Sequence, residues 1–161
     1  MNAPAPIPVL TATRFDDAFT PTCLSNGVIG VTPGVNPLLQ GKTLVSGFVF
    51  SHPQYGFESI APAPFPLGLD IDVAGRRMRD APGAVVTHSQ SLSMESGELL
   101  TRMSFAPAGE KIDLEVTQFV SRSVPCLVCQ EQRQEVIQFT TGGKTHVFPY
   151  HRYRRPFRAR A

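Results

Sequence analysis

Hydrophobic and polar residues alternate with a period of two along much of the chain. The alternation is regular in the segments 67–73, 99–105 and 112–117. Successive side chains of a strand point to opposite faces of its sheet, so this pattern predicts three half-buried β-strands. Two further segments, 27–31 and 43–50, are largely apolar and β-branched, which predicts strands that are buried more deeply.

Turn residues separate the predicted strands. Glu95-Ser-Gly-Glu98 predicts a turn that follows a strand at 88–94. Gly142-Gly143 predicts a two-residue hairpin between strands at 136–141 and 144–148. Strands joined by such short turns run antiparallel.

The frequency of proline and the lack of a helical period decide the fold class. No long window has an apolar stripe with helical spacing, and proline interrupts the chain most densely at 61–66. Short strands about ten residues apart, with Gly and Pro turns between them, are typical of sandwiches. The sequence predicts an all-β fold, an antiparallel β-sandwich.

Charge and proline divide the chain of 161 residues into three predicted parts. Residues 1–14 form an extended Pro-rich leader, residues 15–150 the sandwich domain, and residues 151–161 an Arg-rich tail. The tail carries five Arg and no acid, whereas residues 1–150 carry 10 Lys and Arg against 13 Asp and Glu. The body therefore has no excess of positive charge, which argues against a nucleic-acid partner.

The beginning of the chain has neither the positive start nor the apolar core of a secretory signal. The sequence also has no run of 18 apolar residues, the approximate length that a membrane-spanning helix needs. We therefore expect a cytoplasmic protein without a membrane partner.

Candidate redox and metal centres are few. The three cysteines, Cys23, Cys126 and Cys129, are an odd number, which does not suit the disulfide framework of a secreted domain. Cys126 and Cys129 have the spacing of redox and zinc motifs, but they fall in an apolar segment without further ligands at similar spacing. We interpret them as small strand residues and expect no metal and no cofactor.

Two carboxylate pairs, Asp70/Asp72 and Asp113/Glu115, lie two residues apart along predicted strands. Inverting glycosidases need two carboxyl groups roughly 6.5–9.5 Å apart, and side chains at i and i+2 of any strand are about 6.6–6.8 Å apart. The alternation of the strands already accounts for these acids as residues of a solvent-facing surface. We therefore assign no catalytic residue.

One loop has side chains suited to binding. Residues 51–58 lie between apolar segments and contain His52, Tyr55 and Phe57. Flat rings suit the faces of sugars, and polar ring atoms suit hydroxyl groups. These three residues are the candidate contacts for a carbohydrate or a protein interface. The alternative is a structural loop whose rings cover a sheet edge.

Five segments, taken in order, resemble one known family. They read LSNGVIGV at 24–31, SGFVF at 46–50, PLGLDIDV at 66–73, QSLSMESGELLTR at 90–102 and EVTQFVSRSVP at 115–125. Together they resemble the N-terminal domain of glycoside hydrolase family 65, which includes maltose, trehalose and kojibiose phosphorylases and related α-glucosidases. Ser25 stands where the family usually has Gly, and the pattern ends after Glu131.

The resemblance implies a β-supersandwich that packs against an (α/α)₆-barrel catalytic domain. In the family the catalytic residues belong to the barrel, so the chain resembles a sandwich truncated before the barrel and is expected to be inactive alone. The implied partners are a barrel domain or subunit and α-glucosides, which the family cleaves by phosphorolysis or hydrolysis. Because the family sandwich is longer, strands missing here would leave sheet edges unpaired and an apolar face uncovered.

Two other functions stay open. The chain is alternatively a stand-alone carbohydrate-binding or subunit-contact module that uses His52, Tyr55 and Phe57. The arginines of the tail, interleaved with Tyr153 and Phe157, also suit phosphates and bases, although the tail is short and the body acidic.

Overall fold

The chain folds into two packed antiparallel sheets. The computed structural model describes residues 7–73, 75–107, 111–136, 139–141, 144–146 and 151–158. Its strands and two short 3₁₀ helices are, in chain order, β1 (Val9–Ala12), β2 (Leu24–Ser25), β3 (Ile29–Pro33), β4 (Gly41–Ser51), β5 (Glu58–Ala63), β6 (Asp72–Val73), β7 (Arg76–Arg77), η1 (Met78–Asp80), η2 (Pro82–Ala84), β8 (Val85–Ser93), β9 (Glu98–Phe105), β10 (Ile112–Val120), β11 (Leu127–Val136), β12 (Phe139–Thr141), β13 (Lys144–His146) and β14 (His151–Arg158). The predicted all-β sandwich is confirmed.

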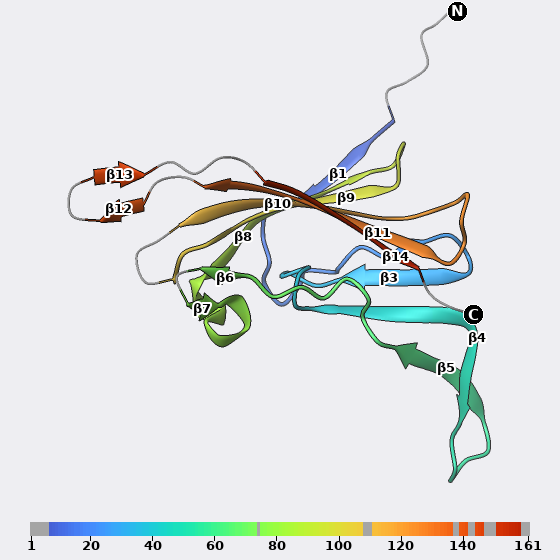
Figure 1. The fold of residues 1–161 in the computed structure, drawn as a ribbon. Coiled ribbons are helices and arrows are strands. Elements are labelled where there is room, and N and C mark those ends of the chain that lie inside the picture. The colour runs from blue at the N-terminus through green and yellow to red at the C-terminus, as the bar shows by residue number, and fades with distance from the viewer. Residues whose placement is uncertain are drawn as a thin grey trace, which may run out of the picture.

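The larger sheet has six strands in the order β1-β8-β9-β10-β11-β14, and the smaller sheet has four in the order β2-β3-β4-β5. Figure 1 shows the smaller sheet lying along one side of the larger, strongly twisted one. Two further strand pairs, β6-β7 and β12-β13, stand apart from both sheets. In the part of the chain that the structure describes, neither helix has the length or the apolar character to cross a bilayer.

Two apolar clusters form the core. The smaller cluster joins the sheets, because Ile29 and Val31 of β3 pack with Leu67 and with Val128 of β11. In the larger cluster, residues of β9 and β10 pack against side chains from loops, from β6 and from η1. Its members are Leu38, Ile71, Val73, Met78, Met103, Phe105, Ile112, Leu114 and Val116.

The loop between β3 and β4 is held by side chains of the larger sheet. Thr87, Gln90 and Gln118 donate hydrogen bonds of 2.8, 2.9 and 3.2 Å to the carbonyl oxygens at positions 35, 34 and 37. Gln90 and Gln118 are buried. These bonds supply partners for loop carbonyls that lie against the sheet, away from water.

Most of the predicted strands are present. The predicted strands at 88–94, 99–105 and 112–117 correspond to β8, β9 and β10, each longer than expected or shifted slightly in its limits. The predicted hairpin is also present, because β12 pairs with β13 from Phe139 opposite His146 to Thr141 opposite Lys144. Gly142 and Gly143 themselves lie outside the described residues.

The prediction of a full strand at 67–73 is wrong. Only Asp72–Val73 pairs as a strand, with β7. The alternation of burial is nevertheless real, because Leu67, Ile71 and Val73 are buried. The main chain of this segment bonds elsewhere: Leu69 N donates to Leu38 O at 2.7 Å. The alternation of the sequence therefore predicted correctly which side chains face the core. The inter-strand hydrogen bonds that define a strand are absent from most of this segment.

The prediction of deep burial for the whole of 43–50 is also wrong. Thr43 is buried, but Leu44, Phe48, Val49 and Phe50 are exposed. The segment does form a strand, β4, whose second half extends beyond the larger sheet (Figure 1). An apolar composition predicts a strand, but it does not predict how far that strand extends beyond the sheet that packs against it.

Two strands of the larger sheet lie in the segments predicted to flank the sandwich. β1, within residues 1–14, pairs with β8 from Val9 opposite Ser93 to Ala12 opposite Gln90. β14, within the Arg-rich segment, pairs with β11 along eight residues. They form the two edges of this sheet.

One asparagine links the two layers. Asn26, in the turn between β2 and β3, donates through Nδ2 to Ser121 O at 2.7 Å and to Pro125 O at 3.0 Å. Its Oδ1 accepts from the backbone N–H groups of Val28 and Ile29, at 3.0 Å each. The side chain thus fixes its own turn and ties it to the loop between β10 and β11.

We predict that Asn26→Asp destabilises the fold by about 1–3 kcal/mol, because a carboxylate retains the two acceptor bonds but places an oxygen against two carbonyl oxygens. Asn26→Ala, which loses all four bonds, is expected to cost about the same or more. Urea unfolding of the purified chain measures both. Gln54→Ala, at an exposed loop position, is the control and should change stability by about 0.5 kcal/mol or less. Equal stability of Asn26→Asp and the unmodified chain would contradict the role given to Nδ2.

Candidate functional site

The second half of β4 and β5 form a hairpin that extends away from the body, at the lower right of Figure 1. The pairing of the two strands is irregular between Leu44 and Val49. Gly47 lies in this irregular stretch with a φ of 78°, a left-handed conformation that glycine adopts at little cost. The bulge redirects the strands, and we call residues 47–60 the projecting hairpin.

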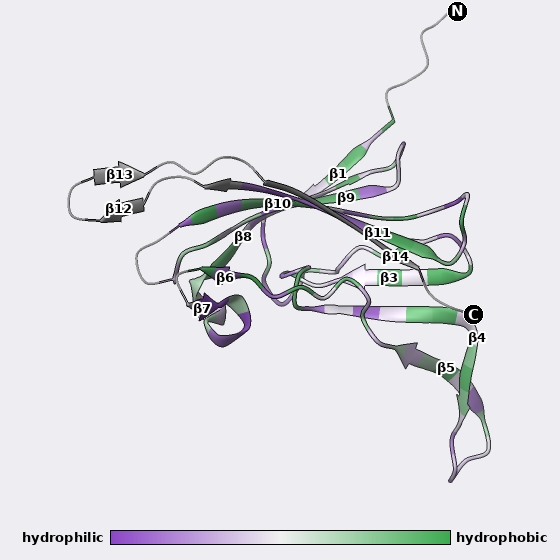
Figure 2. Cartoon of the chain, in the orientation of Figure 1, coloured by the Kyte–Doolittle hydropathy of each residue, from purple (hydrophilic) through white to green (hydrophobic). Residues whose placement is uncertain are grey.

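Both faces of the projecting hairpin carry exposed apolar side chains. Val49 pairs with Ile60, so these two side chains share one face, and Phe48 and Phe50 lie on the other. All four are between 44% and 59% exposed. Figure 2 shows this part of β4 in the green of hydrophobic residues. Exposed apolar side chains gathered on one element make the hairpin a candidate site of interaction.

The tip of the hairpin brings together the three residues predicted as contacts. The ring centroids of His52 and Tyr55 are 4.8 Å apart, those of His52 and Phe57 are 5.4 Å apart, and those of Tyr55 and Phe57 are 6.1 Å apart. The rings of Tyr55 and Phe57 are nearly parallel, at 13°. We call these three residues the aromatic tip. Their role in binding stays a prediction.

Backbone bonds hold the aromatic tip in place. His52 N donates to Phe57 O at 2.9 Å, and Gly56 N donates to His52 O at 3.0 Å. Nδ1 of His52 accepts from Gln54 N at 3.3 Å. Because Nδ1 is an acceptor, the neutral ring carries its proton on Nε2, which is left as a donor. The tip therefore offers apolar ring faces, a hydroxyl and an N–H group.

The paired carboxylates are bound to neighbouring groups. Asp70 forms an ion pair with Arg79, at 2.6 Å between the carboxylate and Nε. Asp72 accepts from Gly75 N at 2.8 Å.

The second pair of acids makes the same kind of contact. Glu115 pairs with Arg102 at 2.8 Å and Asp113 with Lys111 at 3.2 Å, beside an open pocket of about 280 Å³ that Arg133 also lines. Each acid faces a cation or an N–H group, and the pockets beside them are open. This is not the arrangement of an acid and a base across a closed cleft.

The three cysteines are free thiols. Cys126 precedes β11 and Cys129 lies within it, both half-buried, whereas Cys23 is exposed. Burial raises the pKa of the Cys129 thiol, because the thiolate is the form that loses hydration. Among the described residues, no group of three His, Cys, Asp or Glu side chains is arranged to hold a metal ion.

Residues 22–147 match the family model of the glycosyl hydrolase family 65 N-terminal domain. The chain belongs to this family. The match confirms the resemblance seen in the five ordered segments, and it contains both the Asn26 turn and the projecting hairpin. A comparison with curated proteins finds no match.

In this family 65 domain, some residues of interest escaped prediction from the sequence. The side chains of residues 47–50, on the β4 side of the projecting hairpin, were expected in the core, and only the rings of the aromatic tip were proposed as contacts. Two local signals point to the difference. Gly47 permits a bulge, and Pro62, which has no N–H to donate, marks β5 as an edge strand.

We predict that iodoacetamide modifies Cys23 before Cys129 in the folded family 65 domain. The raised pKa of Cys129 lowers its thiolate fraction near pH 8, and partial burial slows access further, so its reaction should be at least severalfold slower. Mass spectrometry of samples quenched between pH 7 and 9 measures both rates. In urea the two rates should converge. Equal rates in the folded chain at pH 7 would show that burial does not protect Cys129.

Proposed function

We propose that this chain is the non-catalytic sandwich domain of a family 65 protein that acts on α-glucosides by phosphorolysis or hydrolysis. We further propose that its projecting hairpin docks on an (α/α)₆-barrel catalytic domain or subunit. The observation that carries the docking proposal is the exposure of apolar side chains on both faces of the projecting hairpin.

The charge pattern of the hairpin supports a protein partner. Between residues 43 and 63 the only charged residue is Glu58. When a second apolar surface covers an apolar, nearly uncharged surface, the removal of both from water stabilises the complex by about 25 cal/mol per Å² of buried area. Helices that cover a sheet hairpin supply such a surface.

The arrangement of the acids supports a non-catalytic role. Asp70, Asp113 and Glu115 form ion pairs near the surface, and Asp72 stabilises a turn. A general acid needs a raised pKa, which comes from burial or from a nearby like charge. Asp70, Asp113 and Glu115 each lie beside a cation instead, and Asp72 lies beside a backbone N–H group.

The aromatic tip favours a second candidate function, in which His52, Tyr55 and Phe57 contact a carbohydrate. Tyr55 and Phe57 are more than half exposed, and their nearly parallel rings offer a flat surface. Such a surface fits the apolar face of a sugar ring. The same tip also fits a role at the edge of the docking surface, so the two functions share residues but differ in partner.

We predict that the 161-residue chain, incubated with maltose, trehalose or kojibiose with or without phosphate, releases neither glucose nor glucose phosphate. The physical reason is that the four acids of its two carboxylate pairs lie beside cations or a backbone N–H group and do not face each other across a closed cleft. Turnover that follows the protein through purification and disappears in Asp70→Asn or Asp113→Asn would overturn the non-catalytic assignment.

We predict that the chain binds the (α/α)₆-barrel domain of a maltose or trehalose phosphorylase expressed without its own sandwich. The double change Phe48→Ser and Phe50→Ser should weaken this binding roughly tenfold or more, because each ring contributes about 1–2 kcal/mol when buried. Analytical ultracentrifugation or calorimetry measures the affinity. Val86→Ser, at an exposed apolar position on β8, is the control and should leave binding unchanged. An equal loss of affinity in both variants would argue against the projecting hairpin as the docking surface.

A further inference from the structure

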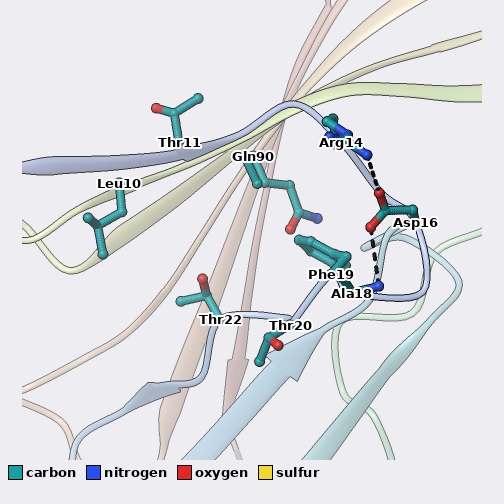
Figure 3. Close-up of a pocket in the computed structure, with 10 residues that line it drawn as sticks. Leu10, Thr11, Arg14, Asp16, Ala18, Phe19, Thr20, Thr22 and Gln90 are labelled. Carbon is teal, nitrogen blue, oxygen red and sulfur yellow. Dashed lines mark hydrogen bonds and ion pairs between the residues drawn. The ribbon is translucent and has the colours of Figure 1, made fainter.

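A pocket of about 550 Å³ lies where β1 and the loop after it meet the larger sheet (Figure 3). Its walls come from β1, from the loop residues 14–22 and from Gln90 of β8. The volume is in the range of sites that hold small molecules. The pocket is distinct from the projecting hairpin, since none of its lining residues belongs to β4 or β5.

Gln90 gives the pocket a fixed hydrogen-bond acceptor. The residue is only 4% exposed, and its Nε2 donates to Gly34 O at 2.9 Å. This bond fixes which end of the carboxamide is the oxygen, because a flipped amide would face one oxygen with another. Oε1 has no donor among the residues that the structure describes. Figure 3 shows the carboxamide pointing toward Phe19 and the threonines of the pocket. The oxygen is accessible from the pocket, so a ligand that donates a hydrogen bond can bond to it without any movement of the side chain.

The charges of the pocket cancel. Arg14 and Asp16 form an ion pair at 2.8 Å, and the other oxygen of Asp16 accepts from Ala18 N at 3.2 Å (Figure 3). Both carboxylate oxygens are therefore engaged within the loop. No unpaired charge among the lining residues would attract an ion, so the pocket favours a neutral ligand.

The rest of the lining combines one aromatic face with hydroxyl groups. Phe19 is half-buried and packs edge-on against Phe15, at 4.9 Å between ring centroids, which limits its rotation. Thr20 and Thr22 also line the pocket, and their hydroxyls make no hydrogen bond within the described part of the chain. An aromatic face beside hydroxyls and a carboxamide suits a ring that has apolar C–H faces and a polar rim.

We propose that this pocket binds a neutral, hydroxyl-rich ring of the size of one pyranose unit. One ligand hydroxyl donates to Oε1 of Gln90, other hydroxyls bond to Thr20 and Thr22, and the C–H face packs on Phe19. The proposal concerns a site separate from the docking surface and does not depend on a barrel partner.

The test is a titration of the isotope-labelled 161-residue chain with glucose, galactose and mannose, followed by NMR. At least one sugar should bind with a dissociation constant on the order of 1 mM, as expected for a ligand of about 12 heavy atoms. The side-chain amide signals of Gln90 should shift on binding. Cyclohexanol, which has a similar ring but a single hydroxyl, should bind at least fivefold more weakly.

Variants locate the binding site. Thr22→Val and Phe19→Leu should each weaken binding at least fivefold while thermal unfolding shows that the fold persists. Thr117→Val on β10 removes a hydroxyl away from the pocket and should leave binding unchanged. Tyr55→Ala should also leave it unchanged, because the aromatic tip is a different site. The proposal is overturned if no sugar binds at a concentration about ten times the expected dissociation constant. It is also overturned if the side-chain signals of Gln90 do not shift, or if Tyr55→Ala abolishes binding.

Discussion

The placement of the second layer depends on polar side chains on the inner face of the six-stranded sheet. Thr87, Gln90 and Gln118 donate to carbonyl oxygens of the loop between β3 and β4. An intramolecular bond of this kind stabilises by only about 1 kcal/mol, but a buried carbonyl left without a donor costs about 1–3 kcal/mol. With its carbonyls satisfied, this loop places Leu38 in the core, fully buried, and sets where β4 begins. Farther along β4, the bulge at Gly47 redirects the strands into the projecting hairpin.

The period of two predicted the strands that lie fully on the larger sheet. Segments 99–105 and 112–117 alternate because one face of β9 and β10 meets the core and the other meets solvent. The same reasoning fails at 67–73, where buried side chains alternate but the main chain bonds to a loop. It fails in another way at 43–50, because composition says nothing about how far a strand extends beyond its partner layer. The sequence thus predicts which side chains are buried more directly than it predicts the inter-strand hydrogen bonds or the extent of each sheet.

The two candidate sites differ in how well the sequence predicts them. His52, Tyr55 and Phe57 lie within six residues of one another, so a single loop reveals them. The pocket combines Gln90 with residues 10–22, and the long stretch of chain between them carries no sign that they meet. The prolines of the first residues also favoured an extended leader, which hid the strand β1. Sites that arise from pairing across a sheet need its register, and the register comes from the fold.

The bulge at Gly47 makes the chain prone to aggregation when nothing covers the projecting hairpin. Residues 43–50 combine high β propensity with no charge and no proline, the composition of segments that assemble into cross-β fibrils. Pro62 lies within β5 and offers no N–H group to an incoming strand, and Glu58 adds one charge at the start of β5, so both residues oppose such assembly. The solubility of this chain at high concentration therefore depends on whether the exposed second half of β4 is covered, and its handling in the cell depends on how soon after synthesis that covering occurs.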